Sequence, residues 1–155
     1  MLKAMLTKEQ PSVLFFDNTY NELMDKPIVK HILLVDDDDV TNFIHEQKLT
    51  EMGIAAKISM AANGSEALDI INASAQKPEV IMLDINMPVM NGIDFLEKFE
   101  KEAQAGYNPR IFIMLTTQLT NDDKTRIQNL NHLITGFMDK PVNNTTFLTL
   151  LKKYF

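Results

Sequence analysis

The chain has 155 residues and contains no cysteine. This absence excludes disulfides, cysteine-ligated zinc sites, iron–sulfur clusters and thiol nucleophiles, and it fits a reducing compartment. Basic residues are in the minority, because 15 Lys and Arg stand against 21 Asp and Glu and leave a formal net charge of -6. Nonspecific binding to nucleic acid or to an anionic membrane needs a basic face, so we expect neither as a direct partner.

The chain also lacks long apolar runs. Residues 111–115 form one of the longest, which is far short of the roughly 20 apolar residues that span a bilayer. Residues 1–10 are interrupted by polar side chains and lack the apolar stretch of a signal peptide. We therefore expect a cytoplasmic protein. The length and a hydrophobic share of 45% predict a single domain with a real core.

Short aliphatic runs alternate with longer segments of helical period from residue 31 onward. This alternation predicts a parallel sheet with helices on both faces, joined by right-handed crossovers. The expected fold class is therefore α/β, a doubly wound five-stranded parallel sheet built as a (βα)5 string. The expected strands are residues 32–35, 54–60, 80–83, 111–115 and 134–138.

Apolar residues at helical spacing predict which faces of the helices are buried. The first helix is expected over residues 40–52, because the spacing of Val40, Phe43 and Ile44 is helical. The last helix is expected to bury one stripe of apolar residues: Phe147, Leu148, Leu151 and Phe155.

Polar residues directly follow four of the expected strands. Asp36 and Asp37 follow the first, Asp84 the third, Thr116 the fourth, and Lys140 comes shortly after the fifth. Ligands of doubly wound sheets bind beyond the carboxyl ends of the strands. We therefore expect these five side chains to form one site.

Carboxylates that converge at one point repel one another unless a cation or a proton neutralises them. Asp36, Asp37 and Asp84 offer only oxygen ligands, which suit Mg2+, Mn2+ or Ca2+, and an incomplete set that keeps waters favours Mg2+. Lys140 adds a positive charge and Thr116 a hydroxyl donor. Such a set has the parts needed to move a phosphoryl group onto one carboxylate.

Four motifs, in this order, resemble those of the receiver domain of two-component response regulators. They are Leu34-Val35-Asp36-Asp37, Leu83-Asp84-Ile85-Asn86-Met87-Pro88 with Gly92, Met114-Leu115-Thr116, and Lys140-Pro141. The resemblance covers residues 31–155 and implies the flavodoxin-like receiver fold. It also implies a stand-alone, single-domain regulator, with residues 1–30 as an N-terminal extension of unknown role.

The resemblance implies how the acidic residues would act. Asp84 would accept the phosphoryl group, and Asp37 would bind Mg2+ directly, with Mn2+ as a possible substitute. Asp36 would act beside it, partly through water. Asn86 would supply its backbone carbonyl to the metal.

The resemblance also assigns roles to the residues after the fourth and fifth strands. Thr116 would hydrogen-bond one phosphoryl oxygen and Lys140 would pair with another. Phe137 occupies the position of an aromatic switch that moves as Thr116 swings toward the phosphate. The Lys140-Pro141 bond is a candidate cis peptide. Thr117 is bulkier than the small residue usual in the family, which bears on access to the phosphoryl group.

The implied partners are proteins of a signalling pathway. A sensor histidine kinase or a histidine phosphotransfer protein would donate the phosphoryl group, and an unknown downstream protein would read the result. The expected output surface is the fourth helix, fifth strand and fifth helix, residues 121–155, and homodimerisation through this region is a family expectation. The chain would catalyse its own phosphorylation and dephosphorylation without being a turnover enzyme.

Other interpretations stay open from the sequence. The acidic pair becomes Asp37 and Asp38 if the first strand runs one residue further, although Asp38 and Asp39 are better placed to cap a helix. A magnesium-dependent phosphatase of the haloacid-dehalogenase type shares the strand-end Asp, but it needs an acid where this chain has Asn86. A degenerate receiver that only binds protein is the third possibility. The histidines lack sequence partners and are expected at the surface: His31, His45 and His132.

Overall fold

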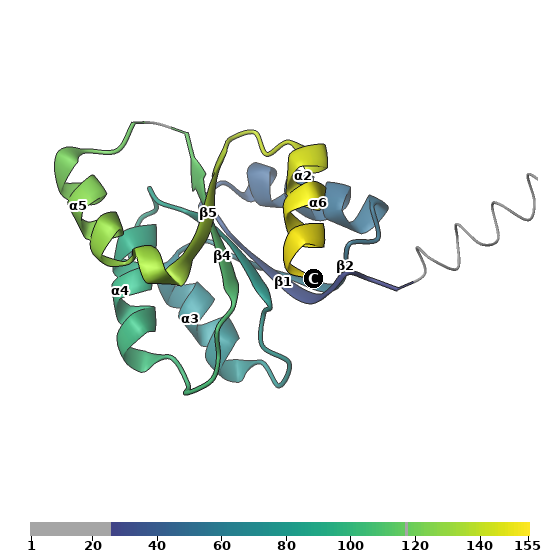
Figure 1. Cartoon of the computed structure of the whole chain (residues 1–155), viewed down its shortest axis with the longest axis horizontal. Coiled ribbons are helices and arrows are strands. Elements are labelled where there is room, and N and C mark those ends of the chain that lie inside the picture. Colours follow the sequence, from purple (N-terminus) through teal and green to yellow (C-terminus); the bar gives the residue numbers. More distant parts are fainter. Residues whose placement is uncertain (1–25, 117) are drawn as a thin grey trace, which may run out of the picture.

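The structure is a computed structural model that describes residues 26–116 and 118–155. Five parallel strands form one sheet in the order β2-β1-β3-β4-β5, with helices on both faces (Figure 1). The predicted fold class is confirmed. Most of the expected extension, residues 1–30, lies outside the described residues, as does Thr117. The strands are β1 (Val29–Val35), β2 (Ala55–Ala61), β3 (Val80–Asp84), β4 (Arg110–Leu115) and β5 (Ile134–Asp139).

The helices connect successive strands, and their labels follow Figure 1. Among the described residues, no helix is long and apolar enough to cross a membrane. The first strand begins at Val29 rather than at residue 32, because Lys30 and His31 interrupt the apolar run without ending the strand. The helices are α2 (Asp39–Glu51), α3 (Gly64–Ala73), α4 (Gly92–Glu102), α5 (Asn121–Asn129) and α6 (Asn144–Tyr154), with a short 3-10 turn η1 (Asn131–Leu133) before β5.

The interior strand β1 contributes to two separate cores, because successive side chains of a strand point to opposite faces. Leu33 and Val35 belong to the core formed with α3, α4 and α5, whereas Ile32 and Leu34 belong to the core formed with α2 and α6. Figure 1 shows these two groups of helices on opposite faces of the sheet. Burial on both faces explains the unbroken apolar run.

The first helix is present as predicted, but the apolar residues whose spacing indicates it face solvent. Val40, Phe43 and Ile44 are 65%, 57% and 43% exposed. The helix begins at its cap, Asp38, and this start sets which residues turn toward the sheet. In the last helix the prediction fails only for Phe155, which is 49% exposed beyond the final turn. The residues that α2 buries are Asn42, His45 and Leu49.

The surface prediction for the histidines is wrong for two of the three. His31 is completely buried in β1, where Nδ1 lies 2.8 Å from the carbonyl of Gln76 and Nε2 lies 2.9 Å from the hydroxyl of Ser59. His45 is buried on the inner side of α2, and His132 is exposed as predicted. The partners of His31 are far from it in the sequence, so no local pattern indicates them.

Helix α5 is attached to its neighbour largely by charge. Its one buried residue in the described structure is Ile127. Arg126 donates hydrogen bonds to Asp94 at 2.6 Å and to Glu97 at 2.9 Å, and both acceptors lie on α4. The hydrogen bond from Arg126 is the main reason that the pKa of Glu97 is lowered. Helix α5 is therefore attached to α4 more by ion pairs than by apolar contacts.

Candidate functional site

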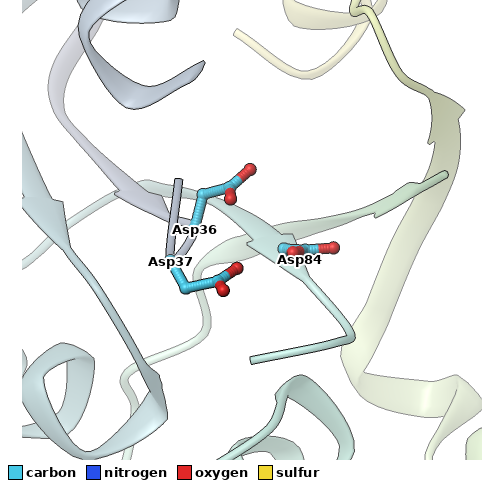
Figure 2. Close-up of side chains that lie close together, drawn as sticks. All are labelled: Asp36, Asp37 and Asp84. Atoms are coloured by element: carbon cyan, nitrogen blue, oxygen red, sulfur yellow. The ribbon is translucent and has the colours of Figure 1, made fainter. Parts of the chain in front are cut away.

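The acidic residues of the site leave neighbouring strands at the same level. Val35 of β1 is the register partner of Leu83 of β3, so Asp36 and Asp84 follow side by side. Figure 2 shows Asp37 turned toward the same place. One carboxylate oxygen from each of the three residues lies within 4.8 Å of the other two. The structure thus brings the predicted acidic triad together.

Asp38, which belongs to the alternative acidic pair, makes its hydrogen bonds at the start of α2. Its Oδ1 accepts from the backbone N–H of Val40 at 3.0 Å, and its Oδ2 accepts from the hydroxyl of Thr41 at 2.7 Å. The hydrogen bond from Thr41 is the main cause that lowers the pKa of Asp38. Asp38 is the N-cap of α2, and Asp39 lies in the first turn, where a negative charge faces the positive end of the helix.

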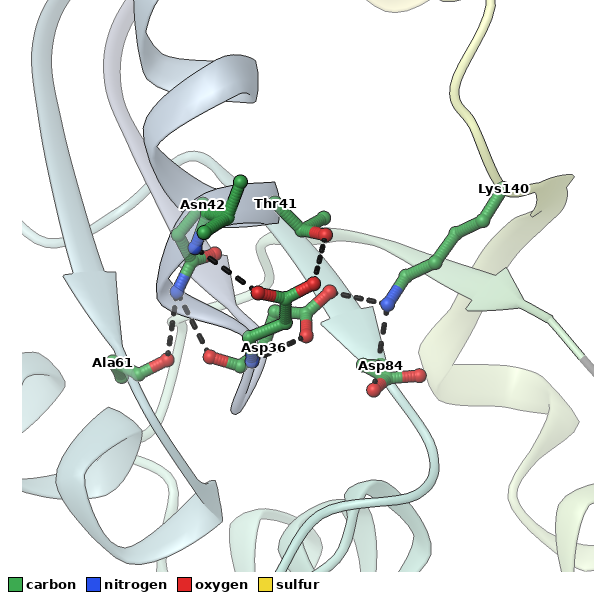
Figure 3. A network of polar contacts seen from close by, with 8 residues as sticks. Asp36, Thr41, Asn42, Ala61, Asp84 and Lys140 are labelled. Atoms are coloured by element: carbon green, nitrogen blue, oxygen red, sulfur yellow. Dashed lines mark hydrogen bonds and ion pairs between the residues drawn. The ribbon is translucent and has the colours of Figure 1, made fainter.

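Lys140 enters the site from the end of β5. Its backbone N–H donates to the carbonyl of Leu115 at 2.9 Å, and the bond to Pro141 is cis, as the resemblance implied. The ammonium forms an ion pair with Asp36 and lies 3.4 Å from Oδ2 of Asp84 (Figure 3). The single positive charge therefore lies between two buried carboxylates.

Burial raises the pKa of Asp84, and the nearby charge of Asp36 acts in the same direction, while Lys140 opposes both. The site therefore holds more negative charge than Lys140 neutralises. A divalent cation would supply the missing positive charge, and the donor set contains only oxygen, which hard cations prefer. Asp37 is exposed, so one side of the triad faces water, and this suits Mg2+, which keeps part of its hydration shell. The residues fit this ion.

The remaining predicted residues lie around the triad. Thr116 is exposed at the end of β4 and, together with Lys140, lines an open cleft of about 670 Å³. Asn86 is exposed two positions after Asp84. Phe137 on β5 is 45% exposed, so it is not a core residue in this structure.

Glycine at position 92 lets α4 start against the acidic loop. Its N–H donates to the carbonyl of Ile85 at 2.8 Å. A Cβ at this position would collide with the backbone carbonyl of Asp84. The glycine is therefore needed for the close approach of two backbones, which fixes the position of the residue that follows β3.

The sequence analysis missed Asn42. This residue is 4% exposed, and its side-chain N–H groups donate to the carbonyls of Asp36 and Ala61 (Figure 3). The position of the N-cap could have indicated it. With Asp38 as the N-cap, the face of α2 that turns toward the sheet contains Asn42 and not Phe43.

A parallel sheet in the order 2-1-3-4-5, with an acidic triad and a lysine at the carboxyl ends of its strands, is the architecture of a receiver domain. The chain matches the response regulator receiver domain family over residues 32–152, and it belongs to that family. Receiver domains are generally phospho-acceptors rather than turnover enzymes, and they partner with histidine kinases in two-component systems.

Individual relatives agree with this assignment. Two-component response regulator 24 of Arabidopsis thaliana is 30% identical over 121 residues, which are 78% of this chain and 81% of that protein. The chemotaxis protein CheY4 of Vibrio cholerae is 28% identical with a TM-score of 0.66, covering 81% of this chain and 98% of that one. The receiver domain of the histidine kinase CKI1 of Arabidopsis thaliana, solved with Mg2+ and BeF3-, is 21% identical with a TM-score of 0.65, over 80% and 90% of the two chains, and it shares the fold. Other curated relatives are longer, and the chain spans 54% or less of their length.

Proposed function

We propose that the chain accepts a phosphoryl group on Asp84 from a histidine kinase or a histidine phosphotransfer protein, with Mg2+ bound at the triad. The observation that carries this proposal is the meeting of three carboxylates within 4.8 Å beside one buried ammonium. Asp36, Asp37 and Asp84 would hold the ion together with the backbone carbonyl of Asn86. Mn2+ offers the same preference for oxygen ligands and can replace Mg2+.

The transfer needs an oxygen of Asp84 to attack the phosphorus of a phosphohistidine. The new bond joins that oxygen to phosphorus, the bond between phosphorus and the imidazole nitrogen breaks, and the electron pair of that bond stays on the nitrogen, which takes up a proton. Bound Mg2+ supplies positive charge to the transferring oxygens. Lys140 pairs with one phosphoryl oxygen, and the hydroxyl of Thr116 donates a hydrogen bond to another.

Asp36 is a poorer nucleophile than Asp84 in this site. Its Oδ1 accepts from the backbone N–H of Asp38 at 3.0 Å, and its Oδ2 pairs with Lys140. The residue is also only 1% exposed. With both oxygens engaged and no access to solvent, Asp36 is suited to hold Lys140 and the cation, and Asp84 is suited to react.

The exposed apolar residues of α2 give the phosphodonor a place to dock. We call Val40, Phe43 and Ile44 the α2 apolar face. Ile44 lines a cavity of about 340 Å³ together with Thr116 and Lys140, so this face is continuous with the rim of the site. Exposed apolar clusters beside a reactive site indicate a protein interface. A donor that covers this face would bring its histidine to Asp84.

The proposed output surface is formed by α5, β5 and α6. Phosphorylation would draw Thr116 toward the phosphoryl group, and Phe137, now 45% exposed, would change its position with it. The shift selects between two states of the domain that are both accessible before phosphorylation. A downstream protein or a second copy of the chain would read the change, and we place the whole pathway in the cytoplasm.

Intact-mass spectrometry after incubation with a small-molecule phosphodonor tests the acceptor. One added phosphoryl group is expected with Mg2+ and none in its absence. Asp84→Asn should abolish the adduct without loss of the fold. Asp38→Asn is the matched control, because asparagine also caps helices and Asp38 lies outside the triad. If Mg2+ and an intact Asp84 give no adduct, and beryllofluoride does not bind either, the chain is a degenerate receiver and the proposal fails.

A further inference from the structure

The carboxylate of Asp37 has no side-chain or backbone partner among the described residues. Within the part of the chain that the structure describes, this side chain makes no hydrogen bond or ion pair, although its neighbours Asp36 and Asp38 make several. It is also the exposed member of the triad. Whatever fixes the peptide between Asp36 and Asp37 therefore restrains the backbone position from which this ligand extends.

That peptide is held by Asn42, which lies one turn into α2. Nδ2 of Asn42 donates to the carbonyl of Asp36 at 2.9 Å and lies 3.4 Å from the carbonyl of Ala61 at the end of β2 (Figure 3). The carbonyl of Ala61 also accepts the N–H of Asp36 at 3.0 Å. The amide group thus joins the ends of β1 and β2 where the acidic loop begins.

Peptide planarity carries this restraint to the next residue. The carbonyl of Asp36 lies in one plane with the N–H and Cα of Asp37. A hydrogen bond that fixes the carbonyl therefore restrains the N–H and Cα of Asp37, the point from which its side chain leaves the backbone. Two carbonyl acceptors also determine the amide orientation of Asn42, because only its NH2 group can face them.

The asparagine carries an energetic cost at this place. Asn42 is 4% exposed, and its Oδ1 is buried without a hydrogen-bond partner among the described residues. Such an unsatisfied buried acceptor is unfavourable, and an apolar residue on the inner face of α2 would avoid it. The NH2 group offsets this penalty by satisfying two carbonyls, and one of them belongs to the peptide that carries Asp37.

We propose that Asn42 is a positioning residue of the cation site: by holding the carbonyl of Asp36, it directs the carboxylate of Asp37 toward Asp36 and Asp84. The inference rests on the proposed function, because the cation in question is the Mg2+ of the phosphorylation site. Asn42 itself touches neither the cation nor the phosphoryl group in this scheme. Its contribution is to restrain the backbone of Asp37, a ligand whose side chain has no other partner among the described residues.

The test compares Mg2+ affinity with fold stability in three full-length proteins. Asn42→Leu keeps the size of the side chain and removes the donor, and Asn42→Ser replaces it if the leucine variant does not fold. Leu49→Ala is the matched control, because Leu49 is buried on the same face of α2 and loses only apolar contacts. Mg2+ dissociation constants come from isothermal titration calorimetry, stability from thermal melting in chelator, and the Asp37 amide is followed by NMR during the titration.

Loss of an outer-shell partner commonly weakens metal binding by about tenfold or more, and we expect this for Asn42→Leu. Leu49→Ala should melt at a lower temperature and bind Mg2+ as the wild type does. Unchanged affinity in Asn42→Leu would overturn the inference, and so would an equal loss of affinity in Leu49→Ala. Wild-type protein that binds no Mg2+ and gains no phosphoryl group would instead overturn the proposed function.

Discussion

Lys140 and Asp36 form an ion pair whose side chains are only 11% and 1% exposed, and the same ammonium lies 3.4 Å from Oδ2 of Asp84. One lysine therefore balances part of the charge of two buried carboxylates. Because the triad carries more negative charge than one ammonium offsets, a divalent cation bound there would act on the same carboxylates as Lys140. Their contributions to stability are thus coupled.

Replacement of Lys140 by methionine tests this coupling. Lys140→Met leaves Asp36 buried without its partner, and removal of one member of a buried pair costs about 3–5 kcal/mol of unfolding free energy. Mg2+ should restore more stability to the variant than it adds to the wild type, because it replaces the missing charge. Urea unfolding with and without Mg2+ measures both effects. An equal gain from Mg2+ in the two proteins would contradict the coupling.

His31 makes the stability of the fold depend on pH. Burial is the main cause that lowers the pKa of His31 below 6.5, and Lys57 acts in the same direction, while the hydrogen bond with Gln76 and the charge of Glu79 oppose it. The unfolded chain therefore takes up this proton at a higher pH than the folded protein. The stability that neutral His31 contributes is present above pH 6.5 and is lost as the pH falls through the lowered pKa.

His31→Leu should remove this part of the pH dependence. At pH values above 6.5 the variant should be less stable by about 1–3 kcal/mol, because the carbonyl of Gln76 and the hydroxyl of Ser59 lose their partner. The difference from the wild type should shrink as the solution is acidified. Urea unfolding at several pH values gives the comparison, and a constant difference would show that His31 does not set the slope.

The α2 apolar face can be tested by separating docking from chemistry. Phe43→Ser should weaken binding of a histidine phosphotransfer protein that phosphorylates the chain by about 1 kcal/mol or more, roughly a fivefold loss of affinity. Phosphorylation by a small-molecule donor should be unchanged, because the acceptor site is intact. Phe155→Ser is the control, since Phe155 is exposed at the far end of α6. Equal effects of both variants on the protein donor would argue against the docking site.

Gly92 is expected to tolerate no side chain. Gly92→Ala places a Cβ against the backbone carbonyl of Asp84, and such overpacking costs about 1–3 kcal/mol. The loop after β3 must shift to accommodate it, so phosphorylation should slow as well. Gly136→Ala is the matched control, because its new Cβ would lie 3.5 Å from Phe112 in ordinary contact. The melting temperature and the rate of adduct formation should both be lower for Gly92→Ala than for Gly136→Ala.

The strands and the triad could be predicted from sequence because both depend on local signals. An unbroken apolar run followed by Asp84, or by Asp36 and Asp37, is visible in a few consecutive residues. The topology of a parallel sheet then brings the strand ends together without further information. The start of α5 depends on a local signal as well, a reciprocal pair of hydrogen bonds between Thr120 and Asp123.

The features that the sequence did not predict depend on which face of α2 turns toward the sheet and on partners that are distant in the sequence. Apolar spacing indicates the helix α2 but not its inward face, because Asn42 and His45 are buried there and Phe43 is not. The position of the N-cap determines which side chains of α2 face the sheet. No local pattern in the sequence shows that an apolar helix face is exposed to solvent. His31 was misplaced because its partners Ser59 and Gln76 come from other parts of the fold.

The attachment of α5 has a consequence for any solution experiment on this chain. The side chains of Arg126, Asp94 and Glu97 are 28%, 46% and 40% exposed, so dissolved ions reach the contacts that hold this helix to α4. Salt screens such contacts, whereas the apolar anchor at Ile127 is insensitive to it. The output side of the domain should loosen as ionic strength rises while the sheet stays unchanged. The salt concentration should therefore affect the attachment of α5 in addition to the proposed effect of phosphorylation.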